Sequence, residues 1–245
     1  MDINSLIVFC VVLLATFTQS LTGFGSGLVT MAFLPAVIGI RASSPLVAMF
    51  AGTLESILFL RFRESINLQA VWRLLAAAII GIPLGILGAR IFNERVVLTI
   101  LGFVLIAYPL YALFTPRLPQ IKEGKITFSV GFIAGLLGGA YNTSGPPVII
   151  YANSRGWSPH EFKANLQVFF LLIDAITIAT HAVSGNITPF VWQNYWLIIP
   201  AIFIGLLAGF FAERFLSPSL FRKIVLGLLI LFGIRMVLSV LVPVV

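Results

Sequence analysis

Long apolar stretches, separated by short polar connections, cover nearly the whole chain. A helix needs about 20 residues to cross the hydrocarbon core of a bilayer, and six stretches approach or exceed that length. A strand with free edges cannot satisfy its backbone hydrogen bonds in lipid, so these stretches predict helices. The six expected spans are 44–61, 70–91, 95–114, 161–182, 190–212 and 219–242.

Two further apolar regions are interrupted by residues that break helices. The sequence GGAYNTSGPP at residues 138–147 lies between the apolar segments 126–140 and 146–153. Because proline lacks a backbone N–H and glycine is a poor helix former, we expect one helix to stop near Ala140 and the next to start with Pro146 in its first turn.

The sequence LTGFGSG at residues 21–27 makes a similar break between the apolar segments 4–18 and 28–40. These flanks are too short to span a bilayer by themselves. Non-helical backbone at membrane depth persists only where protein or a water-filled cavity surrounds it. A pair of interrupted segments, one in each half of a chain, is typical of the binding site of a membrane transporter.

The composition predicts an integral membrane protein with almost no soluble part. Hydrophobic residues make up 60% of the 245 residues and charged residues 9%, whereas a soluble domain has about 25% charged residues. The net charge of +7 is spread between apolar segments, so we expect no nucleic-acid partner. The single cysteine, Cys10, and the two histidines, His160 and His181, form no metal-ligand pattern, so we expect no metal, no cofactor and no enzyme.

The chain repeats itself weakly, which predicts two related halves. We expect residues 1–120 to form the first repeat of one membrane domain and residues 121–245 the second. Each repeat would comprise one broken segment followed by three long helices. Similar residues recur at an offset of 118 to 120 positions: Gly27 with Gly145, Glu55 with Asp174, and Gly85 with Gly205.

The distribution of basic residues favours one of two topologies. If each broken segment crossed the membrane, six lysines and arginines would face one side and eight the other. If each broken segment returns as a re-entrant hairpin, eleven share one side and only Arg41, Arg90 and Arg95 lie opposite. The second arrangement obeys the positive-inside rule and places both termini outside. The fold class expected is therefore an all-α polytopic membrane protein with two inverted repeats, each a re-entrant hairpin plus three transmembrane helices.

The two breaks together predict an anion site. The first N–H groups of the helix after each break have no intrahelical acceptor, and the helix dipole adds about half a positive charge there. Glycine lets the backbone approach a ligand, and serine, threonine and asparagine donate to oxygen atoms. Close helix packing explains the glycines equally well, but not the polar residues. The candidate binding residues are Gly23, Phe24, Gly25, Ser26, Gly27, Tyr141, Asn142, Thr143, Ser144, Gly145 and Pro146.

Ionisable residues inside spans are expensive and often functional. Asp174 lies near the middle of its span, and Glu55 is its counterpart in the repeat. We expect both to be proton-coupling residues, although a neutral carboxyl that is hydrogen-bonded within the bundle is the structural alternative. Asn165 and Gln167 share the span of Asp174 and are candidates for lining the cavity.

These motifs resemble the sulfite exporter TauE/SafE family of membrane transporters, within the toluenesulfonate uptake permease group. The resemblance extends over essentially the whole chain. It rests on TGFG at 22–25, GG at 138–139, NTSGPP at 142–147, Tyr151, RGW at 155–157 and FKA at 162–164. Many members have three consecutive glycines where this chain has residues 25–27 and 144–146. The resemblance implies movement of sulfur oxyanions, such as sulfite and organosulfonates, across the bacterial inner membrane. In that membrane the topology expected from the charge count places both termini on the periplasmic side.

The leading hypothesis is a proton-coupled secondary transporter that works by alternating access around a midplane anion site. A channel for small anions, a transporter of another small organic anion and a subunit of a larger complex are the alternatives. The expected partners are the anionic substrate, protons and the lipid bilayer. The exact substrate, the direction of transport and the oligomeric state, a homodimer included, are left open by the sequence.

Overall fold

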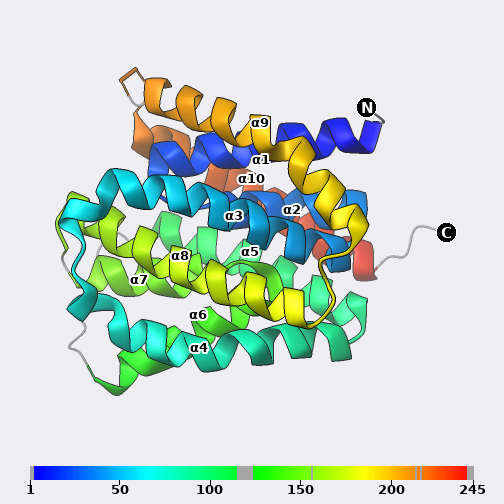
Figure 1. Ribbon diagram of the computed structural model, residues 1–245, viewed down its shortest axis with the longest axis horizontal. Coiled ribbons are helices and arrows are strands. Elements are labelled where there is room, and N and C mark those ends of the chain that lie inside the picture. The colour runs from blue at the N-terminus through cyan, green and yellow to red at the C-terminus, as the bar shows by residue number, and fades with distance from the viewer. Residues whose placement is uncertain (1–2, 115–123, 156, 213, 216, 242–245) are drawn as a thin grey trace.

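The computed structural model describes residues 3–114, 124–155, 157–212, 214–215 and 217–241 (Figure 1). Within these ranges the chain forms ten α-helices and one short 3-10 helix, and no strand. The helices are α1 (Ile3–Thr22), α2 (Ser26–Ile38), α3 (Ile40–Phe62), η1 (Arg63–Ser65), α4 (Leu68–Ile91), α5 (Glu94–Phe114), α6 (Lys125–Tyr141), α7 (Gly145–Ser154), α8 (Pro159–Val183), α9 (Pro189–Ala212) and α10 (Pro218–Leu241).

All six apolar stretches that the sequence marked as spans are helical. Six described helices are long and apolar enough to cross a membrane: α1, α3, α4, α5, α8 and α9. The remaining expected span forms α10, which has 24 residues. The chain is therefore a multi-pass membrane protein.

The expectation that the segment before the first break is too short to span is wrong. Helix α1 runs for 20 residues, about 30 Å at the usual rise, because it continues through the polar residues Thr18 to Thr22. The Thr18 hydroxyl donates to the carbonyl of Leu14 at 2.7 Å, and the Thr22 hydroxyl to the carbonyl of Thr18 at 2.8 Å. These bonds to the preceding turn satisfy the hydroxyls inside the helix.

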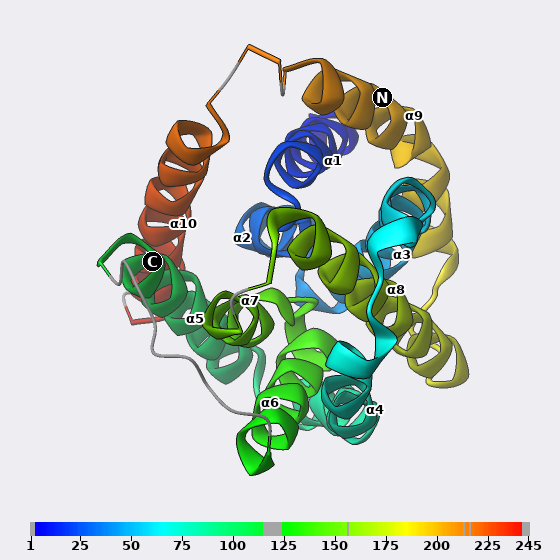
Figure 2. The ribbon, with the colours of Figure 1, turned by 90° about the vertical axis from the view of Figure 1, so that its left-hand side faces the viewer.

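The helices run between two ends of the bundle (Figure 1). One end of the bundle carries the connections α2–α3, α4–α5 and α8–α9, and we call it the α8–α9 end. Helix α1 begins there, and helix α10 terminates there. The connections α3–α4, α7–α8 and α9–α10 lie at the opposite end, called the basic end below. Helices α1 and α2 therefore form a hairpin, and so do α6 and α7. A view along the bundle places α2 and α7 inside a ring of longer helices (Figure 2).

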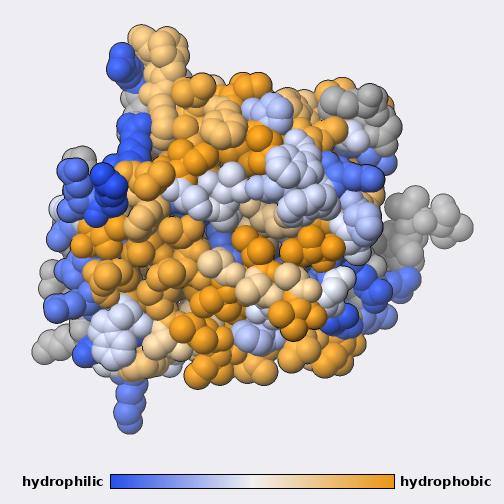
Figure 3. Space-filling model, viewed as in Figure 1, coloured by the Kyte–Doolittle hydropathy of each residue, from blue (hydrophilic) through white to orange (hydrophobic). Residues whose placement is uncertain are grey.

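Charge marks the two ends, and the surface between them is mostly apolar (Figure 3). The element bounds place Arg61, Arg63, Arg73, Lys125, Arg155, Lys163, Arg214 and Lys223 toward the basic end. They place Arg41, Arg90, Arg95 and Arg235 toward the α8–α9 end. Two basic residues used in the topology count, Arg117 and Lys122, lie outside the described residues. The described cations thus follow the arrangement that the hairpin topology requires.

Glycines bring helices from the two halves of the chain into backbone contact. At Gly135 and Gly139 of α6, an added methyl group would collide with the carbonyl oxygens of Ala78 and Ile82 on α4. Helix α9 meets α1 in the same way, because a methyl group at Gly205 would collide with the carbonyl of Leu13. Small residues at membrane helix interfaces allow this close approach. The first arms of both hairpins are therefore fixed against long helices.

We predict that the two ends face opposite sides of the membrane, with the basic end in the cytoplasm. In a Cys10→Ser background, Glu64→Cys in η1 and Val183→Cys at the end of α8 place one exposed thiol at each end. A membrane-impermeant maleimide should label Glu64→Cys only in inside-out vesicles and Val183→Cys only in intact cells. Labelling of both thiols from one side would contradict the hairpin topology.

Candidate functional site

The helices break close to the positions that the sequence predicted. Helix α6 ends at Tyr141 and α7 starts at Gly145, with Pro146 in its first turn. Helix α1 ends at Thr22 and α2 starts at Ser26. Gly25 adopts φ = 106° and Asn142 adopts φ = 51°. The left-handed conformation is costly for most residues and suits glycine and asparagine, so it accounts for these two residue types at the turns.

The two breaks touch each other. A methyl group on Gly27 would collide with the backbone carbonyl oxygen of Asn142. The side-chain amide of Asn142 donates to the carbonyl of Ser44 on α3 at 2.7 Å and lies 3.2 Å from the Ser44 hydroxyl. The two hairpin tips are therefore in direct contact and one of them is tied to α3.

A small cavity of about 30 Å³ lies between the tips. One water needs roughly 10–15 Å³ by this measure, so the cavity has room for a few solvent-sized groups. Both breaks, α3 and α8 contribute to its wall, and α1 adds its last turns. The lining residues are Gln19, Gly25, Ser26, Gly27, Leu28, Ala51, Glu55, Asn142, Thr143, Ser144, Gly145, Phe170 and Asp174.

Gln19 connects the start of α2 to a buried carboxyl group. Its side-chain oxygen accepts a 3.0 Å hydrogen bond from the Ser26 N–H, which is one of the first-turn donors without an intrahelical acceptor. Its amide nitrogen donates to Oε1 of Glu55. The orientation of Glu55 is thus linked to the helix terminus that was expected to bind an anion.

Two carboxyl groups share the cavity, and no basic residue is among its lining. Glu55 is 2% exposed and Asp174 is 7% exposed. Within the described part of the chain, Oε2 of Glu55 has no hydrogen-bond partner, and neither has Oδ1 of Asn142. Buried polar atoms normally have a partner, so these two acceptors are open to a proton or to a donor group of a ligand.

The two helix starts offer different numbers of backbone donors. In α2, Gly27 and Leu28 line the cavity and lie in the first turn. In α7, Gly145 is followed by Pro146 and Pro147, which have no N–H. Donors from the second break are therefore limited to Gly145, to residues before it, and to the side chains of Thr143 and Ser144.

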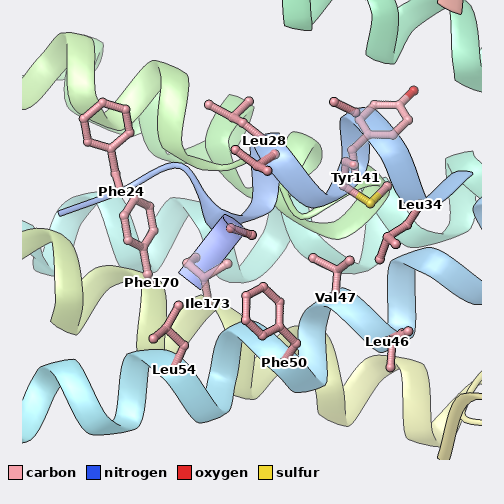
Figure 4. Packing of buried hydrophobic residues seen from close by; sticks show 14 of the residues in the cluster. Phe24, Leu28, Leu34, Leu46, Val47, Phe50, Leu54, Tyr141, Phe170 and Ile173 are labelled. Carbon is pink, nitrogen blue, oxygen red and sulfur yellow. The ribbon is translucent and has the colours of Figure 1, made fainter. Parts of the chain in front are cut away.

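The structure brings nine of the predicted site residues to this cavity and leaves six outside its lining. Gln167 donates to the carbonyl of Gly23 at 3.0 Å, and Asn165 accepts from the N–H of Asn67 at 2.8 Å, next to η1. The other three lie in or beside the hydrophobic core: Phe24, Tyr141 and Pro146. Figure 4 shows Phe24 and Tyr141 well apart within the core.

Sequence reasoning missed Gln19, Leu28, Ala51 and Phe170 as lining residues. Gln19 fell between the apolar segment 4–18 and the break at 21–27. A polar side chain near the end of an apolar helix was the available signal. The other three are apolar residues in apolar helices, and their pattern carries no signal for a cavity.

A bundle of apolar helices, with two broken hairpins meeting around a buried polar cavity, is the architecture of a multi-pass membrane transporter. Residues 8–236 match the family described as Sulfite exporter TauE/SafE, and the chain belongs to this family. The resemblance inferred from the motifs is therefore confirmed. Members of the family are membrane transporters, so the expectation of a transporter in place of an enzyme is confirmed as well.

The named relatives match from about half of the chain to most of it. The chain is 27% identical over 237 residues to a probable sulfite/organosulfonate exporter TauE of Cupriavidus necator, covering 91% of this chain and 90% of the relative. It is 29% identical to a probable membrane transporter protein of Sinorhizobium fredii, over 69% of this chain and 72% of the relative. A probable membrane transporter protein of Haemophilus influenzae is 33% identical over 46% of this chain and 45% of its own length. No solved structure matches the chain.

We predict that Gly27→Ala disturbs the contact between the breaks, because its methyl group would meet the Asn142 carbonyl. Forced overpacking costs typically 1–3 kcal/mol, so the melting temperature of the purified protein should fall by several degrees. Gly227→Ala on α10 is the matched control, since a methyl group there meets no atom within 4 Å. Equal melting temperatures for the two variants would show that the tips do not depend on this contact.

Proposed function

We propose that this protein is a secondary transporter that moves a small sulfur oxyanion, sulfite or an organosulfonate, together with protons. Transport would occur by alternating access around the cavity between the two hairpin tips. The observation that carries the proposal is this cavity, in which helix-start donors and two buried carboxyl groups lie together. The name of the Cupriavidus necator relative supports the substrate class.

Inverted repeats are the architecture that we infer for this mechanism. The first arms end at Thr22 and Tyr141, and the second arms start at Ser26 and Gly145, 119 residues apart in both cases. Helix α1 packs on α9 and α6 packs on α4, so each first arm contacts the fourth helix of the other half. The two hairpins would enter the membrane from opposite faces, with residues 1–120 and 121–245 as the two repeats.

The anion would be held by neutral donors. The backbone N–H groups of Gly27 and Leu28 point out of the start of α2, where the helix dipole favours negative charge. The Ser144 hydroxyl lines the facing break and supplies a further donor. The Thr143 hydroxyl, which donates to the Leu137 carbonyl at 3.5 Å in this structure, would have to turn toward the anion to join it. Without a cation in the lining, binding stays weak enough for release to the other side.

Protons would accompany the anion for an electrostatic reason. An anion in this cavity adjoins Glu55 and Asp174, and like charges in a poorly solvated site repel strongly. Protonation of the carboxyl groups removes this repulsion, so anion binding and proton binding favour each other. Gln19 would transmit the state of Glu55 to α2, since it bonds both to this carboxyl and to the Ser26 N–H.

The proposed location is the bacterial inner membrane, with the basic end in the cytoplasm and both termini on the periplasmic side. The positions of the described cations support this orientation.

The proposal predicts saturable, proton-dependent flux of a sulfur oxyanion by the purified chain in liposomes. Radiolabelled sulfite should accumulate when a pH gradient is imposed, and benzenesulfonate should compete more strongly than acetate. Flux that rises linearly with concentration and ignores the pH gradient would indicate an anion channel instead. Stronger competition by acetate would identify another small organic anion as the substrate class.

We predict that Asp174→Asn abolishes proton-driven accumulation and leaves sulfite binding largely intact. The amide keeps the size of the side chain but cannot take up and release a proton. Glu64→Gln, at an exposed position in η1, is the matched control and should transport like the wild type. Accumulation measured at a fixed pH gradient, alongside binding by calorimetry, separates the two steps. Undiminished accumulation by Asp174→Asn would remove this carboxyl group from coupling.

A further inference from the structure

A second, larger cavity opens near the α8–α9 end of the bundle. Its volume is about 440 Å³, which falls within the usual range of small-molecule sites. It reaches from the connection at Gly185–Thr188 to Gly139 and Ala140 in the last turn of α6. It therefore ends beside the second break, on the side that faces the α8–α9 end of the bundle. We call it the vestibule.

The charge of the vestibule is its most informative property. Arg41 and Arg90 both line it, and no carboxyl group does. Four described arginines lie toward the α8–α9 end, and two of them, Arg95 and Arg235, are not in the lining. Half of the described cations toward the cation-poor end thus line one cavity. The guanidinium group is well suited to sulfonate-like oxyanions, because its planar fork binds two oxygens at once.

The rest of the wall is chemically mixed in a way that fits an organic anion. Ser44, His181 and Thr188 supply polar groups beside the arginines. Ile40, Ile86 and Ala140 supply apolar surface that can accept the carbon part of an organosulfonate. The central cavity, at about 30 Å³, has no comparable room.

A chain of hydrogen bonds separates the vestibule from the central cavity. The amide nitrogen of Asn186 lies 2.8 Å from Nδ1 of His181. An amide nitrogen can only donate a hydrogen bond, so Nδ1 accepts it and Nε2 of the ring carries the proton. Nε2 lies 3.3 Å from the Ser44 hydroxyl. Ser44 in turn accepts from the side chain of Asn142, which lines the central cavity. The Asn142–Ser44 pair is thus shared by the walls of both cavities.

We propose that the vestibule is a second binding site for the transported oxyanion, with Arg41 and Arg90 as its ligands and the Asn142–Ser44–His181 chain as the partition toward the central cavity. The site would hold the anionic group of sulfite or of an organosulfonate, and its apolar wall would favour the organosulfonate. This proposal rests on the proposed transport function. It adds a site, a substrate preference and a side of the membrane to that function.

Transport kinetics in oriented membrane vesicles test the vestibule. Loss of a hydrogen bond to a charged group weakens binding roughly tenfold or more. In Arg41→Gln with Arg90→Gln, the KM for benzenesulfonate should rise by about that factor when substrate reaches the α8–α9 end, with kcat little changed. In vesicles of the opposite orientation the KM should stay at the wild-type value. Arg95→Gln is the matched control and should behave as wild type in both orientations.

Binding to the detergent-purified full chain provides a readout that is independent of transport. Calorimetric titration with benzenesulfonate should show a loss of affinity in the Arg41→Gln/Arg90→Gln double variant but not in Arg95→Gln. Arginine-dependent binding by a chain that fails to transport would keep the vestibule and overturn the proposed function. Wild-type transport and wild-type affinity in the double variant would overturn the vestibule and leave the proposed function standing. Absence of both binding and transport in the wild type would overturn both.

Discussion

The contact between Gly27 and the carbonyl oxygen of Asn142 is the constraint on which the site depends. It brings together two segments of non-helical backbone in the interior of a bundle whose outer surface is largely apolar. Backbone groups in such a place must find partners or a polar cavity, because lipid offers none. The glycine rows of α4, α6 and α9 make the contact geometrically attainable, since they bring the first arms of both hairpins close to long helices. Side chains at these glycines would push the tips apart, and the two breaks would then no longer line one cavity.

The two tips are similar in outline but unequal in chemistry. Helix α2 has Gly27 and Leu28 in its first turn and offers their backbone donors. In α7 two prolines follow Gly145, so the side chains of Thr143 and Ser144 are left as the main donors. Gln19 and Asn142 are also unequal, because the first bonds to a carboxyl group and the second to the backbone of α3. A carrier with two identical tips would bind its substrate alike from both sides. This inequality gives the two faces of the cavity different chemistry.

The sequence predicted the fold better than the site, for identifiable physical reasons. Helix breaks follow from local chemistry, so the positions near Ala140 and Pro146 could be placed to within one residue. The length of α1 could not, because threonine hydroxyls satisfied inside the helix extend it past the apolar run. Which side chains face a cavity depends on helix rotation and on distant partners. Gln167 was expected to line the cavity because it shares the span of Asp174, but it bonds to the Gly23 carbonyl instead. Gln19, which does line the cavity, was overlooked.

The two cavities have opposite electrostatic character, and together they could both attract an anion and release it. The central cavity has carboxyl groups and neutral donors, so in our proposal it can release an anion but attracts one poorly from solution. The vestibule has two arginines and no carboxyl group in its lining, and in our proposal it concentrates anions. In the proposed mechanism, an anion that leaves the guanidinium groups would meet the Asn142–Ser44 pair next, and it would pass only when these hydrogen bonds break. The proposal thus assigns attraction, selection and proton coupling to different residues along one path.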